Sequence, residues 1–429
     1  MASIRLRTGA WYGDEVLDLD FPNGWDVVVW WPRTPAPMSD RDIVATLETP
    51  TNQIPIRTQC VGKRRPLLVV DDLNRPTPVA AIMPFVLAQF RDAGLMMNCI
   101  TILVASGMHA PPCRESLLKK LGPEAVSSCR VITHDYSRGL ARVGKTRRGT
   151  PVDVNVELLR SDFVLGIGGL YPNHTAGFGG GSKLALGVLG GKTIAHLHGH
   201  QGVGWGGTPN NDMRKELDEI ARMLQMNTMI TLHVDADRKL VKIHSGDHFT
   251  YYDKAIEFCR TTYSAPAPHD ANVVVSNTYP NDMSLTFARM KGMAPLDAWA
   301  PSAASRVAIA GCAEGLGRHN LFPLARFPEL LWLQAVARRG SAMSVGNIGR
   351  KLVRKFAKSL GSAKIPKHQK LPIMVYWTYT PASPVPVSVA QMSVVRSWDR
   401  ILKSVQLEQQ HKTRLKVVVY PCAPLQILS

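Results

Sequence analysis

The stretch FVLGIGGLYPNHTAGFGGGSKLALGVLGGKTIAHLHGH, residues 163–200, is the part of the chain that decides the fold. It begins with an apolar run that predicts a buried strand, and eleven glycines follow between Gly166 and Gly199. Because glycine adopts positive φ readily and lets a ligand approach the backbone, this density predicts a cofactor cradle. The stretch also carries Lys183 at the end of a glycine run and histidines at positions 174, 196, 198 and 200.

Two familiar nucleotide-binding motifs match this stretch poorly. A P-loop has its lysine directly after glycine and then Ser or Thr, whereas here Ser182 precedes Lys183 and Leu184 follows it. The dinucleotide fingerprint GxGxxG begins at Gly166 but has Tyr171 in place of its third glycine. The stretch still contains a lysine amine presented by a flexible run of glycines, a glycine collar, and such an amine can bond covalently to a cofactor. It also contains imidazoles, which can bind nickel, zinc or copper. A glycine-rich turn with a surface lysine is the alternative, and spacing alone does not decide between the two.

Strand and helix patterns alternate on both sides of the stretch. Apolar runs at residues 66–72, 99–107 and 130–135 are separated by loops and helical patterns, which is typical of βαβ units around a mostly parallel sheet. We therefore predict an α/β fold of two domains with mostly parallel sheets. Residues 1–265 would form the N-terminal cofactor-binding and catalytic domain, and residues 266–429 a C-terminal α/β domain.

Polar residues follow several of the predicted strands. In open α/β sheets, ligands bind at the carboxyl ends of the strands, so these residues are expected in one crevice with the glycine stretch. They are Asp71, Asp72, Arg75, His109 and His134.

The composition places few limits on function. Hydrophobic residues make up 45% of the chain, which is ordinary for a globular protein. The apolar runs are too short to span a bilayer and the N-terminus lacks the apolar centre of a signal peptide, so we expect a cytoplasmic protein. Seven cysteines without a CxxC pair argue against a disulfide framework or a thiolate metal site.

Positive charge is concentrated in one segment. The formal net charge is +18, and ten Lys or Arg residues fall within residues 338–370, while residues 330–398 contain no acidic residue. The pattern favours a basic amphipathic helix with a solvated face. Nucleic acid or an anionic surface is the alternative partner, although only Phe356 supplies the aromatic stacking that single-strand binders use.

With these residues assembled, the chain resembles the lactate racemase family, the nickel-pincer hydroxyacid racemases and epimerases. The similarity covers most of residues 5–315. Each motif is weak alone, and their order makes the resemblance specific. The motifs are DDLNRPTP at 71–78, GMH at 107–109, HD at 134–135, PNHTAGFGGGSK at 172–183, TIAHLH at 193–198 and YPND at 279–282.

The resemblance implies a cofactor. In that family a pyridinium dithio-mononucleotide, bonded covalently to a lysine, holds nickel through sulfur, carbon and sulfur, and a histidine supplies the remaining ligand. By motif position, the cofactor-binding residues here are Lys183, Asp72, Gly179, Gly180 and Gly181, and the nickel ligand is His198 or else His200 or His196.

The resemblance also implies an isomerase that inverts the hydroxyl-bearing carbon of a 2-hydroxy acid or related substrate by reversible hydride transfer to the cofactor. His109 and His174 fall at the positions of the family's two catalytic histidines, which exchange the hydroxyl proton. Arg75 falls at a substrate-binding position. The expected partners are a small hydroxy acid or sugar-like substrate and the enzymes that build the pincer cofactor, and neither a membrane nor nucleic acid is expected. The active site would lie in the interdomain cleft.

The chain departs from lactate-type members on the substrate side. Those members have a glutamine and a lysine where this chain has Phe287 and Met290, and the neighbouring Arg289 and Lys291 are expected to point elsewhere on their helix. A larger, more apolar hydroxy acid or a polyol-like sugar is therefore plausible as substrate. Two alternatives stay open: a protein of this fold that lacks the pincer and acts as another metal-dependent enzyme, and a basic protein that binds nucleic acid or an anionic surface.

Overall fold

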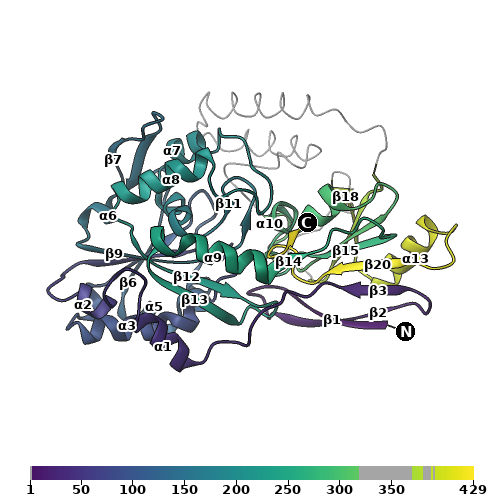
Figure 1. Ribbon diagram of the computed structural model, residues 1–429, viewed down its shortest axis with the longest axis horizontal. Coiled ribbons are helices and arrows are strands. Elements are labelled where there is room, and N and C mark those ends of the chain that lie inside the picture. The colour runs from purple at the N-terminus through teal and green to yellow at the C-terminus, as the bar shows by residue number, and fades with distance from the viewer. Residues whose placement is uncertain (1, 318–369, 380–387, 390–391) are drawn as a thin grey trace.

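The computed structural model describes residues 2–317, 370–379, 388–389 and 392–429. Each of its two lobes is built around one β-sheet, and the lobes lie at the left and right of Figure 1. Of the basic segment 338–370, only Lys370 falls within the described residues, so the amphipathic helix predicted there is not tested. Two α/β units with mostly parallel sheets agree with the predicted fold class.

The first sheet has six strands in the order β13-β12-β9-β4-β5-β6. All neighbours are parallel except β12 and β13. The central strands are buried on both faces, which explains why they appear in the sequence as continuous apolar runs. The strands are β4 (Pro66–Asp71), β5 (Thr101–Ala105), β6 (Arg130–Thr133), β9 (Phe163–Gly169), β12 (Thr228–Val234) and β13 (Leu240–Asp247).

Helices cover both faces of this sheet. On one face, α3 (Val79–Asp92) packs through apolar residues such as Ile82 and Phe90. On the other face, α8 (Asp212–Met223) packs through Leu217 and Ile220. The other elements of this lobe are α1 (Asp40–Glu48), α2 (Ile56–Gln59), η1 (Met97–Cys99), α4 (Arg114–Leu121), α5 (Pro123–Ser128), β7 (Leu140–Lys145), β8 (Pro151–Asn155), α6 (Val156–Arg160), β10 (Pro172–Asn173), β11 (Gly177–Phe178), η2 (Gly181–Val188), α7 (Gly191–Leu197) and α9 (His248–Tyr263).

The second sheet has seven strands in the order β18-β19-β17-β16-β15-β20-β3, and only the β18–β19 pair is antiparallel. Its strands are β3 (Asp26–Val29), β15 (Val273–Asn277), β16 (Ser305–Ala310), β17 (Ile373–Trp377), β18 (Ser388–Val389), β19 (Met392–Val395) and β20 (Lys416–Tyr420). The remaining described elements of this lobe are α10 (Leu285–Gly292), η3 (Pro295–Trp299), α13 (Trp398–Glu408), and the short strands β14 (Ser264–Ala265) and β21 (Ile427–Leu428), which pair with each other.

The N-terminal strands pack with the second sheet rather than with the first. Strand β3 runs parallel to β20, and the hairpin of β1 (Ala2–Thr8) and β2 (Glu15–Phe21) packs its buried face against that sheet. Figure 1 shows these purple strands beside yellow β20. The expected division at residue 265 therefore departs from the structure for the first 30 residues, because they bury their apolar side chains in the C-terminal core.

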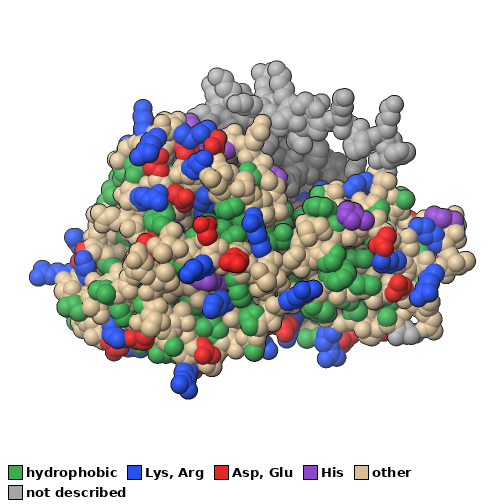
Figure 2. Space-filling model, in the orientation of Figure 1, with side chains coloured by type: hydrophobic (Ala, Val, Ile, Leu, Met, Phe, Trp, Pro, Cys, Tyr) green, Lys and Arg blue, Asp and Glu red, His purple; other side chains and the backbone are tan. Residues whose placement is uncertain are grey.

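The surface of the described part of the chain is mixed in charge. On the face shown in Figure 2, Lys and Arg side chains are interspersed with Asp and Glu over both lobes. No helix among the described residues is long and apolar enough to cross a membrane.

Candidate active site

A carboxylate and an imidazole form a close pair where two neighbouring strands end. Asp72 follows β4 and His109 lies in the turn after β5, so parallel pairing of these strands places both residues at one edge of the sheet. His109 Nδ1 lies 2.6 Å from Asp72 Oδ2, which also accepts a hydrogen bond of 2.7 Å from Asn74 Nδ2. With Nδ1–H donating to Asp72, the lone pair of His109 is on Nε2, where the imidazole can accept a proton.

The environment keeps Asp72 ionised. Burial opposes ionisation, but the charges of His109 and Arg75, together with the hydrogen bonds from His109 and Asn74, lower the pKa of Asp72 to about 2. The charged carboxylate behind His109 fixes the orientation of the ring.

Asp71 has a bracing role. Its Oδ1 lies 2.6 Å from Nζ of Lys120, a fully buried lysine. Its Oδ2 accepts hydrogen bonds from Thr77 Oγ1 at 2.7 Å and from Gly169 N at 3.0 Å. Asp71 therefore ties the loop of residues 72–78 to β9 and α4. Sequence reasoning missed Lys120, which carries no motif signal.

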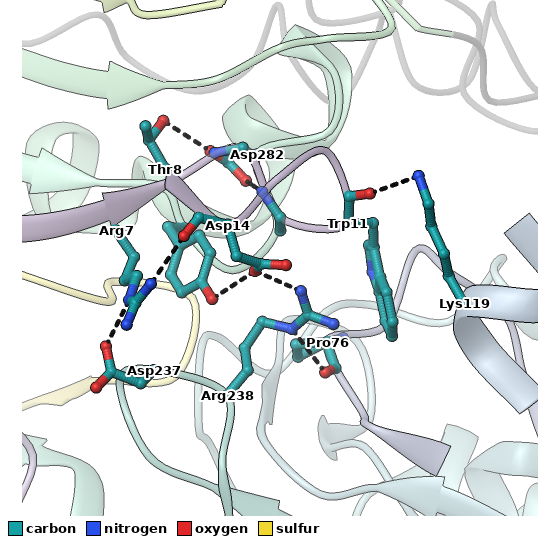
Figure 3. A network of polar contacts seen from close by, with 12 residues as sticks. Arg7, Thr8, Trp11, Asp14, Pro76, Lys119, Asp237, Arg238 and Asp282 are labelled. Carbon is teal, nitrogen blue, oxygen red and sulfur yellow. Dashed lines mark hydrogen bonds and ion pairs between the residues drawn. The ribbon is translucent and has the colours of Figure 1, made fainter. Parts of the chain in front are cut away.

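Residues where the two lobes meet also hold the loop of residues 72–78 in place (Figure 3). Asp14, in the turn between β1 and β2, accepts hydrogen bonds from Arg238 Nη1 at 2.5 Å and from Tyr279 Oη at 2.7 Å. Asp282 of the YPND motif accepts hydrogen bonds from the backbone of this turn. Three side chains then donate to backbone carbonyls of the loop: Trp11 Nε1 to Leu73 at 2.9 Å, Arg238 Nε to Pro76 at 3.2 Å and Asn281 Nδ2 to Asn74 at 2.9 Å.

The predicted glycine cradle leads directly into Lys183. Gly180 and Gly181 adopt φ of +66° and +51°, and a Cβ on Gly181 would lie 2.8 Å from the ring of Tyr252. Tyr252 Oη donates to Gly179 O at 2.9 Å, and Arg214 Nη1 donates to Gly180 O at 3.2 Å. A tyrosine and an arginine thus pack behind the collar, and at Gly181 only glycine fits.

A serine and a histidine hold the residue before Lys183. Ser182 Oγ lies 2.9 Å from His248 Nε2, and His248 Nδ1 lies 3.0 Å from Asn227 O. The Nδ1–H donates to the carbonyl, so Nε2 accepts the serine hydroxyl. This buried pair fixes the backbone from which Lys183 projects, and no sequence motif indicated it.

Lys183 lies in a cationic environment that favours its neutral amine. Burial, followed by the charges of Arg75, Lys291 and Arg214, puts the pKa of Lys183 well below its ordinary value. A neutral amine is a nucleophile, whereas a protonated one is not. A neutral Lys183 amine at this site could therefore bond covalently to a cofactor.

The three alternating histidines have different partners. His198 Nδ1 donates to Ile194 O at 2.8 Å, so its Nε2 carries the lone pair that a metal ligand needs. Burial and the nearby charges of Lys183, Lys291 and His109 lower the pKa of His198 to about 3. The other two histidines have partners from other elements: His196 Nδ1 lies 2.9 Å from Thr150 Oγ1, and His200 Nε2 lies 2.5 Å from Glu216 Oε2. The geometry favours His198 among the three alternatives.

His174 and His134 lie in different surroundings. His174 is exposed in the turn between β10 and β11, where its ring lies against Gly202. His134 is buried, with Nε2 2.9 Å from Leu189 O, so it braces the chain that follows η2. Asp135 is exposed and caps its own turn by accepting from Ser137.

Helix α10 brings two residues of the second lobe to the site. The ring of Phe287 lies edge-on to that of His109, with centroids 5.3 Å apart and an interplanar angle of 88°. Lys291 is 9% exposed, and its charge acts on both Lys183 and His198. The expectation that Lys291 points elsewhere is wrong, whereas Arg289 does point away and pairs with Asp297. The site therefore lies between the two lobes, as predicted.

The donor set limits how a metal could be held. Within the part of the chain that the structure describes, no three His, Cys, Asp or Glu side chains come together in a group that could hold a metal ion. Among the described residues, His198 therefore has no cluster of further side chains of these types around it.

The fold and the site together define an α/β enzyme with its candidate active site between two lobes. The model of the lactate racemase N-terminal domain matches residues 12–205. Lactate racemases of Lactiplantibacillus plantarum and Thermoanaerobacterium thermosaccharolyticum are 25% and 24% identical over 296 and 295 residues, in each case 66% of this chain and 69% of the relative. The first part of the chain thus matches the lactate racemase N-terminal domain, and the chain is similar to two lactate racemases, which are isomerases, over about two thirds of its length.

Solved structures agree on the fold. The lactate racemase apoprotein of Thermoanaerobacterium thermosaccharolyticum superimposes with a TM-score of 0.74 at 20% identity and covers 100% of both chains. A crystal structure of a protein from Thermotoga maritima gives a TM-score of 0.61 at 16% identity, covering 92% of this chain and 100% of that one.

Proposed function

We propose that this protein is a nickel-pincer racemase or epimerase that inverts the hydroxyl-bearing carbon of a 2-hydroxy acid or a related substrate. The observation that carries the proposal is the convergence of Lys183, His198 and His109. Lys183 and His109 both act electrostatically on His198, although His109 is far from the other two residues in the sequence. The family relatives named lactate racemase support the same class of substrate.

The residues around Lys183 fit the proposed cofactor. The amine of Lys183 would carry the nucleotide, the collar of Gly179, Gly180 and Gly181 would admit it, and His198 Nε2 would complete the nickel ligands. The cations around Lys183 suit an anionic group such as a nucleotide phosphate. When bound, the cofactor supplies a metal-supported acceptor for hydride.

His109 would move the substrate's hydroxyl proton. Asp72 holds Nδ1, which leaves Nε2 to accept the proton and later return it. Because Asp72 stays ionised, it stabilises the imidazolium while the proton is on His109. His174, in its exposed turn, is proposed as the second base, for the opposite stereoisomer, on the strength of its motif position.

Arg75 and Lys291 would bind the substrate's carboxylate. The charges of Arg75 and Lys291 both act on Lys183, which places these two cations near the same part of the site. An arginine and a lysine from different lobes on one carboxylate would also hold the lobes together around the substrate. Lys291 would thus help to bind the carboxylate, the role of the glutamine and lysine that lactate-type members have where this chain has Phe287 and Met290.

The decisive experiment is intact-protein mass spectrometry with peptide mapping and nickel analysis, on protein produced together with the pincer-synthesis enzymes. We expect a nucleotide adduct on Lys183 in the wild type and none in Lys183→Ala, with Lys192→Ala, an exposed lysine on α7, as the matched control. His198→Ala should keep the adduct but lose nickel, whereas His196→Ala should keep both.

An unmodified Lys183, under conditions that load a known family member, would overturn the proposal. If His196→Ala or His200→Ala loses nickel and His198→Ala keeps it, the ligand assignment is wrong although the cofactor assignment stands. The cytoplasmic location and the partnership with the cofactor-building enzymes stay predictions.

A further inference from the structure

Helix α10 presents an apolar ring and an ammonium group on one face. Phe287 and Lys291 are four residues apart, so their side chains lie one above the other along the helix. The N-cap Ser284, whose side chain accepts from Phe287 N, fixes where the helix starts and hence which residues share this face. The face is directed at the first lobe, because Phe287 meets His109 and the charge of Lys291 acts on Lys183 and His198.

Phe287 lies against His109, so its ring would border the place of the substrate's hydroxyl-bearing carbon. It is 4% exposed and its ring contacts the imidazole that would take the hydroxyl proton. A substrate whose hydroxyl reaches His109 Nε2 therefore places a group on the same carbon within reach of the ring. A phenyl ring offers no hydrogen bond, so a polar group buried there would lose its water without compensation.

The charges around the site select an anion as well. The charges of Arg75 and Lys291 both act on Lys183, so these two cations lie near the same part of the site. A polyol-like sugar has no charge to offer these cations, and its hydroxyls would meet Phe287. An acid with one carboxylate and one apolar substituent meets both requirements.

We propose that α10 makes this protein selective for 2-hydroxy acids with a large apolar substituent: Lys291 binds the carboxylate and Phe287 contacts the substituent. The inference rests on the proposed function and adds the substrate class and the residue that sets it. Replacing the methyl group of lactate by the isobutyl group of 2-hydroxy-4-methylpentanoate adds three carbons. If buried against Phe287, they favour the larger acid by roughly 10- to 60-fold in kcat/KM.

The test compares lactate and 2-hydroxy-4-methylpentanoate on the loaded enzyme. We expect the wild type to prefer the larger acid and Phe287→Gln to lose that preference roughly tenfold or more. Phe287→Leu, which keeps an apolar side chain, should retain most of it. Phe85→Gln, the same change on α3 away from the site, should leave the ratio unaltered. A wild type that prefers lactate, or a ratio that Phe287→Gln does not alter, would overturn the inference.

A binding measurement separates this inference from the proposed function. Calorimetric titration of the cofactor-free protein with each acid should show tighter binding of 2-hydroxy-4-methylpentanoate to the wild type and a smaller difference for Phe287→Gln. If the acids bind in this way but no adduct forms on Lys183, the pincer assignment fails and the role of α10 stands. If the adduct forms but the two acids bind equally, the pincer assignment stands and the role of α10 is refuted.

Discussion

Replacing Asp72 by asparagine should destabilise the protein in a manner that depends on pH. Burial works against the charge of Asp72, yet its basic and amide neighbours lower its pKa from 3.8 to about 2. A difference of about 1.8 units corresponds to about 2.4 kcal/mol at about 1.36 kcal/mol per unit. Because the folded-state pKa is the lower one, this stabilisation is present above pH ~4 and is lost as the pH falls towards ~2.

Urea unfolding of the wild type and Asp72→Asn measures the effect. The free energy of unfolding should differ by about 2 kcal/mol at pH 7, by about half of that at pH 3, and by little at pH 2. Asp18→Asn is the matched control, since Asp18 pairs with Arg5 on the surface and its removal should change stability little. A difference between wild type and Asp72→Asn that stays constant from pH 7 to pH 2 would refute the reasoning, because the effect would then not come from the charge.

Three further substitutions test other parts of the site. Lys120→Met leaves the buried carboxylate of Asp71 unpaired and should cost about 3–5 kcal/mol in urea unfolding, and a loss below about 1 kcal/mol would contradict its bracing role. Lys291→Met should lower kcat/KM of the loaded enzyme for 2-hydroxy acids roughly 10- to 100-fold. Arg289→Met is the control and should have little effect, because Arg289 pairs with Asp297. Equal losses of kcat/KM in the two variants would argue against carboxylate binding by Lys291. Asp14→Asn weakens the two hydrogen bonds that Asp14 accepts from Arg238 and Tyr279, and it should lower the free energy of unfolding by about 1–3 kcal/mol. It should also speed amide hydrogen exchange in residues 71–78. Unchanged exchange would show that these hydrogen bonds do not hold this loop.

Much of the first lobe was predictable because its signals are local. Apolar runs bounded by loops predicted β4, β5 and β9. The rule that ligands gather at strand ends then brought Asp72 and His109 together, and the structure confirms this with a contact of 2.6 Å. The motif register supplied the remaining candidates.

The second lobe and the choice among histidines depended on distant contacts. Strand β3 pairs with β20, nearly 400 residues away, and no local pattern indicates this partner. His196, His198 and His200 alternate along the chain identically, and only Thr150 and Glu216, which come from other elements, distinguish them.

The sequence by itself determined which groups the site can contain: a lysine on a glycine collar, histidines, and a carboxylate followed by an arginine. These groups can be read from the sequence because they depend only on residue type and on spacing within one strand or loop. Only the tertiary structure decided that Lys291 and Phe287 reach this site. Their direction depends on where α10 begins and on how the second lobe packs against the first, and both are set by contacts between residues far apart in the chain.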